Sequence, residues 1–205
     1  MPYLKHIPEI IKPFAKHLIF NISNASNEIY LTFDDGPHPT ITPWVLDKLD
    51  AYSARGTFFL VGENAQKYPE LVKEIIRRGH QIGNHSQNHL DGWKTSLDKY
   101  VQNVEECNQH LATTLFRPPY GQITLSQANN LKSGYKLIMW SDLSADFDPS
   151  VSVEKVIQHA THKTESGSII VFHDSDKAWP RLKDALEPCL EYYQEKGYNM
   201  EAINL

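Results

Sequence analysis

Short apolar runs alternate along the chain with longer segments in which apolar residues recur every three or four positions. Several of the short runs are apolar on both faces, which is typical of strands buried beneath helices. The amphipathic segments between them are long enough to be crossover helices. Seven strands are predicted, at residues 28–34, 57–62, 80–84, 114–117, 136–141, 168–173 and 198–203.

Helical periodicity is clearest in four segments between these runs. Two of the segments end at Gly79 and Gly197, as expected where a helix stops in a left-handed residue. The alternation of strands and helices predicts the α/β class with a largely parallel sheet, and no internal repeat or linker interrupts it. The four segments are residues 40–54, 69–79, 97–112 and 179–197.

Composition narrows the class of protein without fixing its function. The 205 residues are 40% hydrophobic and carry a formal net charge of −5, which fits one globular domain and excludes the basic surface that nucleic acid requires. No apolar stretch approaches the roughly 20 residues needed to span a bilayer. The first twenty residues show no export signal, so we expect a cytoplasmic protein. Cys107 and Cys189 stand alone in helical patterns and are expected to be small buried residues.

Polar residues gather at the ends of five predicted strands. Because parallel strands deliver their carboxyl ends to one edge of the sheet, we expect these side chains to converge there. They are Asp34, Asp35, His85, His89, Arg117, Asp146, His173 and Asp174.

His85 and His89 are four residues apart, directly after a strand. On one turn of helix the two imidazoles would share a face and grip one metal ion, although a chance pair at the surface or in the core is an even alternative. Asp35 supplies a third ligand and leaves an open position for water, as catalytic zinc requires. Asp34 then remains free to act as a base.

Five motifs in this order resemble the polysaccharide deacetylases of carbohydrate esterase family four, which include the nodulation-type chitooligosaccharide deacetylases with their NodB-like domain. The motifs are TFDDGPHP, NHSQNH, RPPYG, WSDLSADFD and IIVFHDS. The resemblance implies an irregular seven-stranded β/α barrel. It also implies a deacetylase catalytic domain at residues 28–205, preceded by an N-terminal extension at residues 1–27.

The resemblance also implies the roles of the site residues. Asp34 would be the general base, oriented and kept ionised by Arg117, and the backbone N–H of Tyr120 would help to form an oxyanion hole. His173 would be the general acid, with Asp146 rather than Asp142 as its partner. The ligands of one divalent metal ion, Zn²⁺ in the first place with Co²⁺ or Ni²⁺ as alternatives, would be Asp35, His85 and His89.

The function implied is a metal-dependent hydrolase that removes acetyl groups from an acetylated carbohydrate. N-acetyl groups of chitooligosaccharide or peptidoglycan glycan are expected first, with acetylated xylan and O-acetyl groups as alternatives. Metal-activated water would attack the carbonyl while Asp34 accepts a proton and His173 donates one. Two other functions stay open: a noncatalytic carbohydrate-binding module on the same fold, and a hydrolase of a small cyclic amide.

Some positions near the motifs depart from the family pattern or admit two interpretations. Phe147 follows Asp146 where the family usually has tryptophan, which predicts a smaller aromatic wall. Trp93 and Trp179 either stack on sugar or simply pack, whereas Trp44 is expected in the core. His38 lies between two prolines and is expected to belong to the turn rather than to ligate the metal.

Overall fold

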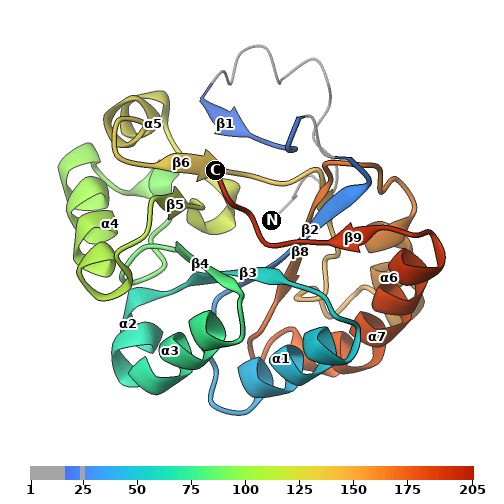
Figure 1. Ribbon diagram of the computed structural model, residues 1–205. Coiled ribbons are helices and arrows are strands. Elements are labelled where there is room, and N and C mark those ends of the chain that lie inside the picture. The colour runs from blue at the N-terminus through green and yellow to red at the C-terminus, as the bar shows by residue number, and fades with distance from the viewer. Residues whose placement is uncertain (1–16, 24–25) are drawn as a thin grey trace.

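The computed structural model describes residues 17–23 and 26–205. A curled sheet occupies the centre of the molecule, and helices α1 to α7 lie around its outside (Figure 1). The predicted N-terminal extension at residues 1–27 lies largely outside the described residues.

The sheet is parallel and follows the order β1-β6-β5-β4-β3-β2-β8-β7, with β9 beside β2. This confirms the predicted α/β barrel. The strands are β1 (Leu18–Ile19), β2 (Glu28–Asp34), β3 (Gly56–Leu60), β4 (Gln81–Asn84), β5 (Leu115–Phe116), β6 (Lys136–Ile138), β7 (Asp142–Leu143), β8 (Ile169–His173) and β9 (Asn199–Met200).

Each of the seven predicted strands has a counterpart, and the structure adds the two-residue strands β1 and β7. The curl closes where the segment after β1 meets the segment before β8, through an antiparallel bridge between Asn21 and Ser168. The Ser141 N–H also donates to the Ile169 carbonyl at 3.0 Å, which ties the residues after β6 to β8. These contacts make the barrel irregular rather than evenly closed.

The four predicted helical segments form α1, α3, α4 and α7, and three further helices complete the outer layer. Helix α5 begins with a capping box, in which the Thr124 side chain accepts from the Gln127 N–H and the Gln127 side chain accepts from the Thr124 N–H. The helices are α1 (Ile41–Ala51), α2 (Gly62–Lys67), α3 (Pro69–Arg77), α4 (Leu97–Leu111), α5 (Leu125–Leu131), α6 (Val153–Thr161) and α7 (Trp179–Glu195).

Strand β2 shows how the sheet separates an outer core from the barrel interior. Leu31 and Phe33 pack with the apolar faces of the helices, whereas Tyr30 belongs to a second cluster inside the barrel with Phe59. Successive side chains point to opposite faces of a strand, so Thr32 and Asp34 share the inner face with Tyr30. Burying one large apolar side chain contributes about 1.5–3 kcal/mol, so both clusters hold β2 in place.

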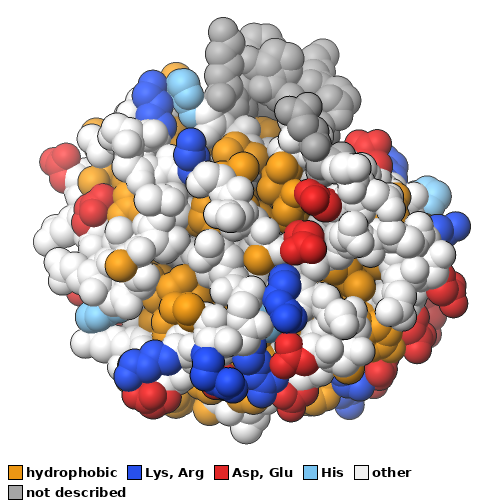
Figure 2. All heavy atoms as spheres, viewed as in Figure 1, with side chains coloured by type: hydrophobic (Ala, Val, Ile, Leu, Met, Phe, Trp, Pro, Cys, Tyr) orange, Lys and Arg blue, Asp and Glu red, His pale blue; other side chains and the backbone are white. Residues whose placement is uncertain are grey.

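Other expectations about the interior and surface also hold. Cys107 and Cys189 are free and buried, as predicted. Trp44 is partly buried and packs edge-to-face against Trp179, with ring centroids 5.1 Å apart. Basic and acidic side chains are interspersed over the face shown in Figure 2. In the part of the chain that the structure describes, no helix has the length and apolar character needed to cross a membrane.

Candidate metal centre and catalytic site

The candidate site lies at the carboxyl ends of the strands. Asp34 and His173 are the last residues of neighbouring strands β2 and β8, and they are partners in the parallel register. Arg117 follows β5, and Asp146 follows β7. The topology therefore brings together residues that are up to 139 positions apart in the sequence.

Asp35, His85 and His89 form the candidate metal centre. Each offers one ligand atom, and these atoms lie within 4.8 Å of one another. The Nε2 atom of His89 lies 3.1 Å from Asp35 Oδ1, and that of His85 lies 3.8 Å from the same oxygen. Ligands of a tetrahedral zinc ion are about 3.3 Å apart, so the three side chains are close to a binding arrangement.

The two histidines do not lie on a helix, which corrects the predicted helical turn. Residues 85–90 form a loop in which Ser86 and His89 have φ angles of 63° and 53°. Asn103 of α4 binds backbone N–H groups of this loop: its carbonyl accepts from Gln87 and its side-chain oxygen accepts from the next residue. These bonds replace the helical ones, and the loop still brings the two imidazole centroids to 5.0 Å.

His85 is held in the form that binds metal. Its Nδ1 atom lies 2.8 Å from the Arg117 carbonyl oxygen. A carbonyl only accepts, so Nδ1 carries the proton and Nε2 keeps its lone pair toward Asp35. Burial lowers the pKa of His85 to about 4, so the ring is neutral at pH 7.

The Asp35 carboxylate is the anionic member of the three. Burial opposes its charge, but the His89 hydrogen bond and the neighbouring histidines outweigh burial and lower its pKa well below the usual range. The Asp35 φ of 81° is uncommon for a residue with a side chain. One carboxylate and two imidazoles whose Nε2 atoms converge on it are a donor set that suits zinc, so the residues fit the expected ion.

Arg117 fixes Asp34 from inside the barrel. The guanidinium is fully buried and donates from Nη1 to Asp34 Oδ1 and to the Thr32 hydroxyl, both at 2.7 Å. Its remaining donors reach the carbonyls of Ile138 and Met139. Because Arg117 is held by four acceptors, it orients the Asp34 carboxylate rigidly.

His173 and Asp146 form the second polar pair. His173 Nδ1 lies 2.7 Å from Asp146 Oδ1, and the His173 backbone N–H donates to Oδ2 at 2.8 Å. Burial lowers the pKa of His173, but the Asp146 carboxylate outweighs it, with smaller contributions from Asp35 and Asp34, and the pKa rises to about 9. The imidazole is therefore protonated at neutral pH.

Tyr120 borders the candidate metal centre. Its ring packs edge-to-face against His89, with centroids 4.6 Å apart, and its side chain is 62% exposed. The residue adopts a left-handed conformation with φ 59° between Pro119 and Gly121. The predicted oxyanion donor thus sits beside the three candidate ligands.

Asp174 is a buried acid for which the sequence suggested no role. It accepts a hydrogen bond from the Thr42 hydroxyl, and its backbone N–H donates to the Asp34 carbonyl at 3.1 Å. A Cβ at Gly36 would lie 2.2 Å from its Oδ2, so only glycine fits beside this carboxyl. Burial raises the pKa of Asp174 to about 8. The sequence placed Asp174 at the end of a predicted strand, in the motif IIVFHDS, without indicating what it does.

The remaining aromatic and histidine residues differ in their surroundings. Trp179 packs on Trp44, whereas Trp93 is 67% exposed, so sugar stacking by Trp93 stays a prediction. The Phe147 ring lies edge-to-face on His173, with centroids 4.9 Å apart. His38 Nδ1 accepts backbone N–H groups at the start of α1, which agrees with its predicted place in the turn.

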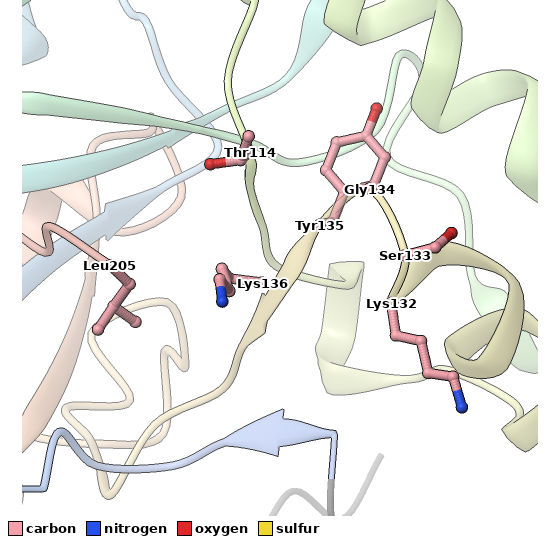
Figure 3. A pocket seen from close by; sticks show the side chains of 7 residues that line it. All are labelled: Thr114, Lys132, Ser133, Gly134, Tyr135, Lys136 and Leu205. Carbon is pink, nitrogen blue, oxygen red and sulfur yellow. The ribbon is translucent and has the colours of Figure 1, made fainter.

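Two hollows lie at the opposite, amino ends of the strands. One, of about 350 Å³, is lined by residues around the start of β6, and Figure 3 shows Lys132 pointing away from the space between Thr114, Lys136 and Leu205. The other, of about 300 Å³, lies beside the starts of β3 and β4. Neither hollow is lined by a residue of the candidate site.

Comparison with known proteins adds independent findings. The profile of the polysaccharide deacetylase family matches residues 21–137. A peptidoglycan-N-acetylglucosamine deacetylase of Bacillus cereus is 33% identical over 195 residues, which cover 92% of each chain. A chitooligosaccharide deacetylase of Azorhizobium caulinodans is 33% identical over 75% of this chain and 76% of its own. A crystal structure of a peptidoglycan N-acetylglucosamine deacetylase, in complex with 4-naphthalen-1-yl-N-oxidanyl-benzamide, has a TM-score of 0.85 and 30% identity, covering 94% of both chains.

Proposed function

The chain belongs to the polysaccharide deacetylase family, and from this membership we propose that it hydrolyses N-acetyl groups of a carbohydrate such as peptidoglycan glycan or chitooligosaccharide. It is a hydrolase that acts on carbon–nitrogen bonds. One observation carries the proposal: the Asp34–Arg117 pair and the His173–Asp146 pair lie beside three convergent metal-binding side chains.

Asp35, His85 and His89 would hold one divalent cation, with zinc favoured by the donor set. When bound, a zinc ion lowers the pKa of water to about 7 and polarises a carbonyl oxygen. The second oxygen of Asp34, Oδ2, receives no hydrogen bond from any described residue, while Oδ1 is held by Arg117. Asp34 is thus oriented to accept a proton from the attacking water at Oδ2.

His173 supplies the proton that the departing sugar amine needs. Asp146 accepts from Nδ1–H, which leaves Nε2–H of the imidazolium as the donor toward substrate. The Tyr120 N–H donates to no described residue and is proposed to stabilise the oxyanion, a contribution of about 10²-fold or more. After proton transfer Asp34 is protonated and His173 has lost its proton, so both side chains end the step uncharged.

Acetate release from a panel of acetylated saccharides tests this function. The panel comprises chitooligosaccharides, peptidoglycan glycan strands and acetylated xylan, each assayed with added Zn²⁺ and with a chelator. We expect zinc-dependent release of acetate and appearance of free amine on the N-acetylated substrates. Retained glycan binding with no acetate release on any substrate would instead indicate a noncatalytic module.

A further inference from the structure

Lys177 is a cation beside the candidate catalytic acid that no part of the proposed mechanism uses. It lies in the connection between β8 and α7, four residues after His173. Its Nζ atom stands over the Phe147 ring, 5.0 Å from the centroid. The same ring contacts His173 at 4.9 Å, so the ammonium is one aromatic ring away from the imidazole.

The backbone of Lys177 is held in place. Its carbonyl accepts from Arg181 Nη2 at 2.5 Å, and Arg181 Nε donates to the Asp146 carbonyl. The Arg181 guanidinium is therefore occupied by two backbone acceptors of the site. Lys177 itself is exposed to solvent, so its ammonium is accessible to a ligand.

The acidic residues on the segments around Lys177 contact other groups. Asp176 lies 3.3 Å from His38 Nε2, Asp148 accepts hydrogen bonds from Ser150, and Asp146 binds His173. Among the described residues no carboxylate forms an ion pair with Lys177. Lys94, in the loop beyond the metal-binding histidines, differs because it pairs with Asp91 at 2.9 Å.

A cation over an aromatic ring keeps its full charge, because this contact contributes only about 0.5–1 kcal/mol at an exposed site. A single lysine offers one positive charge, so it suits one negative charge better than a phosphate dianion, which arginine clusters usually bind. A carboxylate is the monoanion that glycans commonly carry. The Phe147 ring separates the ammonium from His173, so a carboxylate bound by Lys177 belongs to a sugar next to the one that loses its acetyl group.

We propose that Lys177 is a specificity residue that binds a carboxylate on the sugar adjacent to the acetamido sugar undergoing hydrolysis, an inference that rests on the proposed function. Glycans with ether-linked lactate or uronic acid groups would then be better substrates than neutral chitooligosaccharides. The Phe147 ring lies beneath the ammonium and helps to hold it in position. Lys177 would contact the substrate equally before and during the reaction, so its loss should raise KM and leave kcat unchanged.

The test compares peptide-free peptidoglycan glycan strands, in which the lactyl carboxylates are free, with the same strands after amidation of these carboxylates. A second pair, fragments of alternating N-acetylglucosamine and glucuronic acid with free or amidated carboxylates, distinguishes a uronic acid from a lactyl source. Lys177→Gln should lower kcat/KM about three- to tenfold on a free-carboxylate glycan and less than about twofold on the amidated one. Lys177→Arg should restore the preference, and added salt should weaken it.

Lys196→Gln is the matched control, because Lys196 also stands over an aromatic ring, that of Tyr192, but beyond the far end of α7. Equal loss on free and amidated glycans, or no loss on either, overturns the assignment of Lys177 while acetate release still supports the deacetylase. If the unmodified protein releases no acetate from any glycan, the proposed function fails and the inference falls with it.

Discussion

Two adjacent carboxylates at the end of β2 have opposite surroundings. Asp34 points into the barrel and meets the buried guanidinium of Arg117, whereas Asp35 turns outward with a φ of 81° and meets two imidazoles. Each negative charge therefore has its own positive or polar partners, and the repulsion between neighbours is offset. This division also separates the proposed base from the proposed metal ligand.

Substituting these residues should separate chemistry from metal binding. Asp34→Asn keeps the size of the side chain but cannot accept the proton, so we expect kcat to fall about 10²–10⁴-fold with zinc content unchanged. His85→Ala removes a ligand and should lose zinc as well as activity. Steady-state kinetics and elemental analysis of the purified proteins check both outcomes. Normal turnover by Asp34→Asn would contradict its role as base.

The pH dependence of activity should report on His173. Protonated His173 is the proposed acid, so activity falls as pH rises through its pKa, which is about 9. Asp146→Asn removes the charge that raises this pKa, and we expect the alkaline limb of kcat/KM to move to lower pH by about 1 unit or more. A bound cation lowers the pKa in both proteins, so the difference between their profiles is informative.

Asp142→Asn is the control for this shift, because Asp142 is also buried but accepts from the Ser141 hydroxyl and does not bind His173. Its alkaline limb should match that of the unmodified protein. An unmoved limb in Asp146→Asn would contradict the pairing as the cause of the raised pKa.

At the residue scale, the sequence did not predict the buried environment of Asp174. The proposed ligands, base and acid were visible because their types recur in ordered motifs at strand ends. The environment of Asp174 depends on Thr42 and Gly36, which are more than 130 positions away and carry no chemical signature of their own. The burial of the Asp174 carboxyl follows from tertiary packing and cannot be deduced from the residues next to it in the sequence.

Asp174→Asn should change how stability depends on pH. Burial raises the folded-state pKa of this acid to about 8, so its contribution to stability is fully present below its ordinary value and is lost as pH rises through about 8. Asparagine stays neutral and can still accept from Thr42. Between pH 6 and pH 9 the Tm of the unmodified protein, measured with a chelator, should fall more than that of the variant. Parallel Tm curves would contradict the raised pKa.

At the scale of elements, the apolar pattern around each strand decided which strands the sequence predicted. Runs rich in apolar residues located β2, β3 and β8, since burial on both faces leaves a clear pattern. Strands β5 and β9 have two residues each but lie inside longer predicted segments, whereas the equally short β1 and β7 lie outside any predicted segment. The histidine loop was mistaken for a helical turn because the bonds that shape it come from Asn103, in an element 15 residues later.

Helix α4 ends in a conformation that its sequence does not favour. Ala112, the residue after the helix, is exposed and has φ 49° and ψ 49°, the left-handed region where a Cβ costs about 1–2 kcal/mol. Ala112→Gly should therefore raise the free energy of unfolding by about 0.5–1 kcal/mol, measured by urea denaturation. The control is Ala51→Gly at the last residue of α1, which should destabilise by a similar amount. Destabilisation by Ala112→Gly would contradict the strain argument.

At the scale of the whole molecule, the barrel assembles its site from connections that are distant in the chain. The proposed ligands come from the ends of β2 and β4, with β3 between them in the sheet. A cation bound there would join these connections in the folded state only. Metal binding and folding should therefore be thermodynamically linked.

Thermal unfolding with and without zinc measures this linkage. At a free Zn²⁺ concentration of 100 times its Kd, binding contributes about 2.7 kcal/mol, which corresponds to a rise in Tm of roughly 5–10 °C for a chain of this size. His85→Ala should abolish the rise because it removes a buried ligand. His110→Ala, at the exposed end of α4, should retain it, since His110 lies outside the candidate site. An equal rise in all three proteins would show that zinc binds elsewhere, and the assignment of Asp35, His85 and His89 would have to be abandoned.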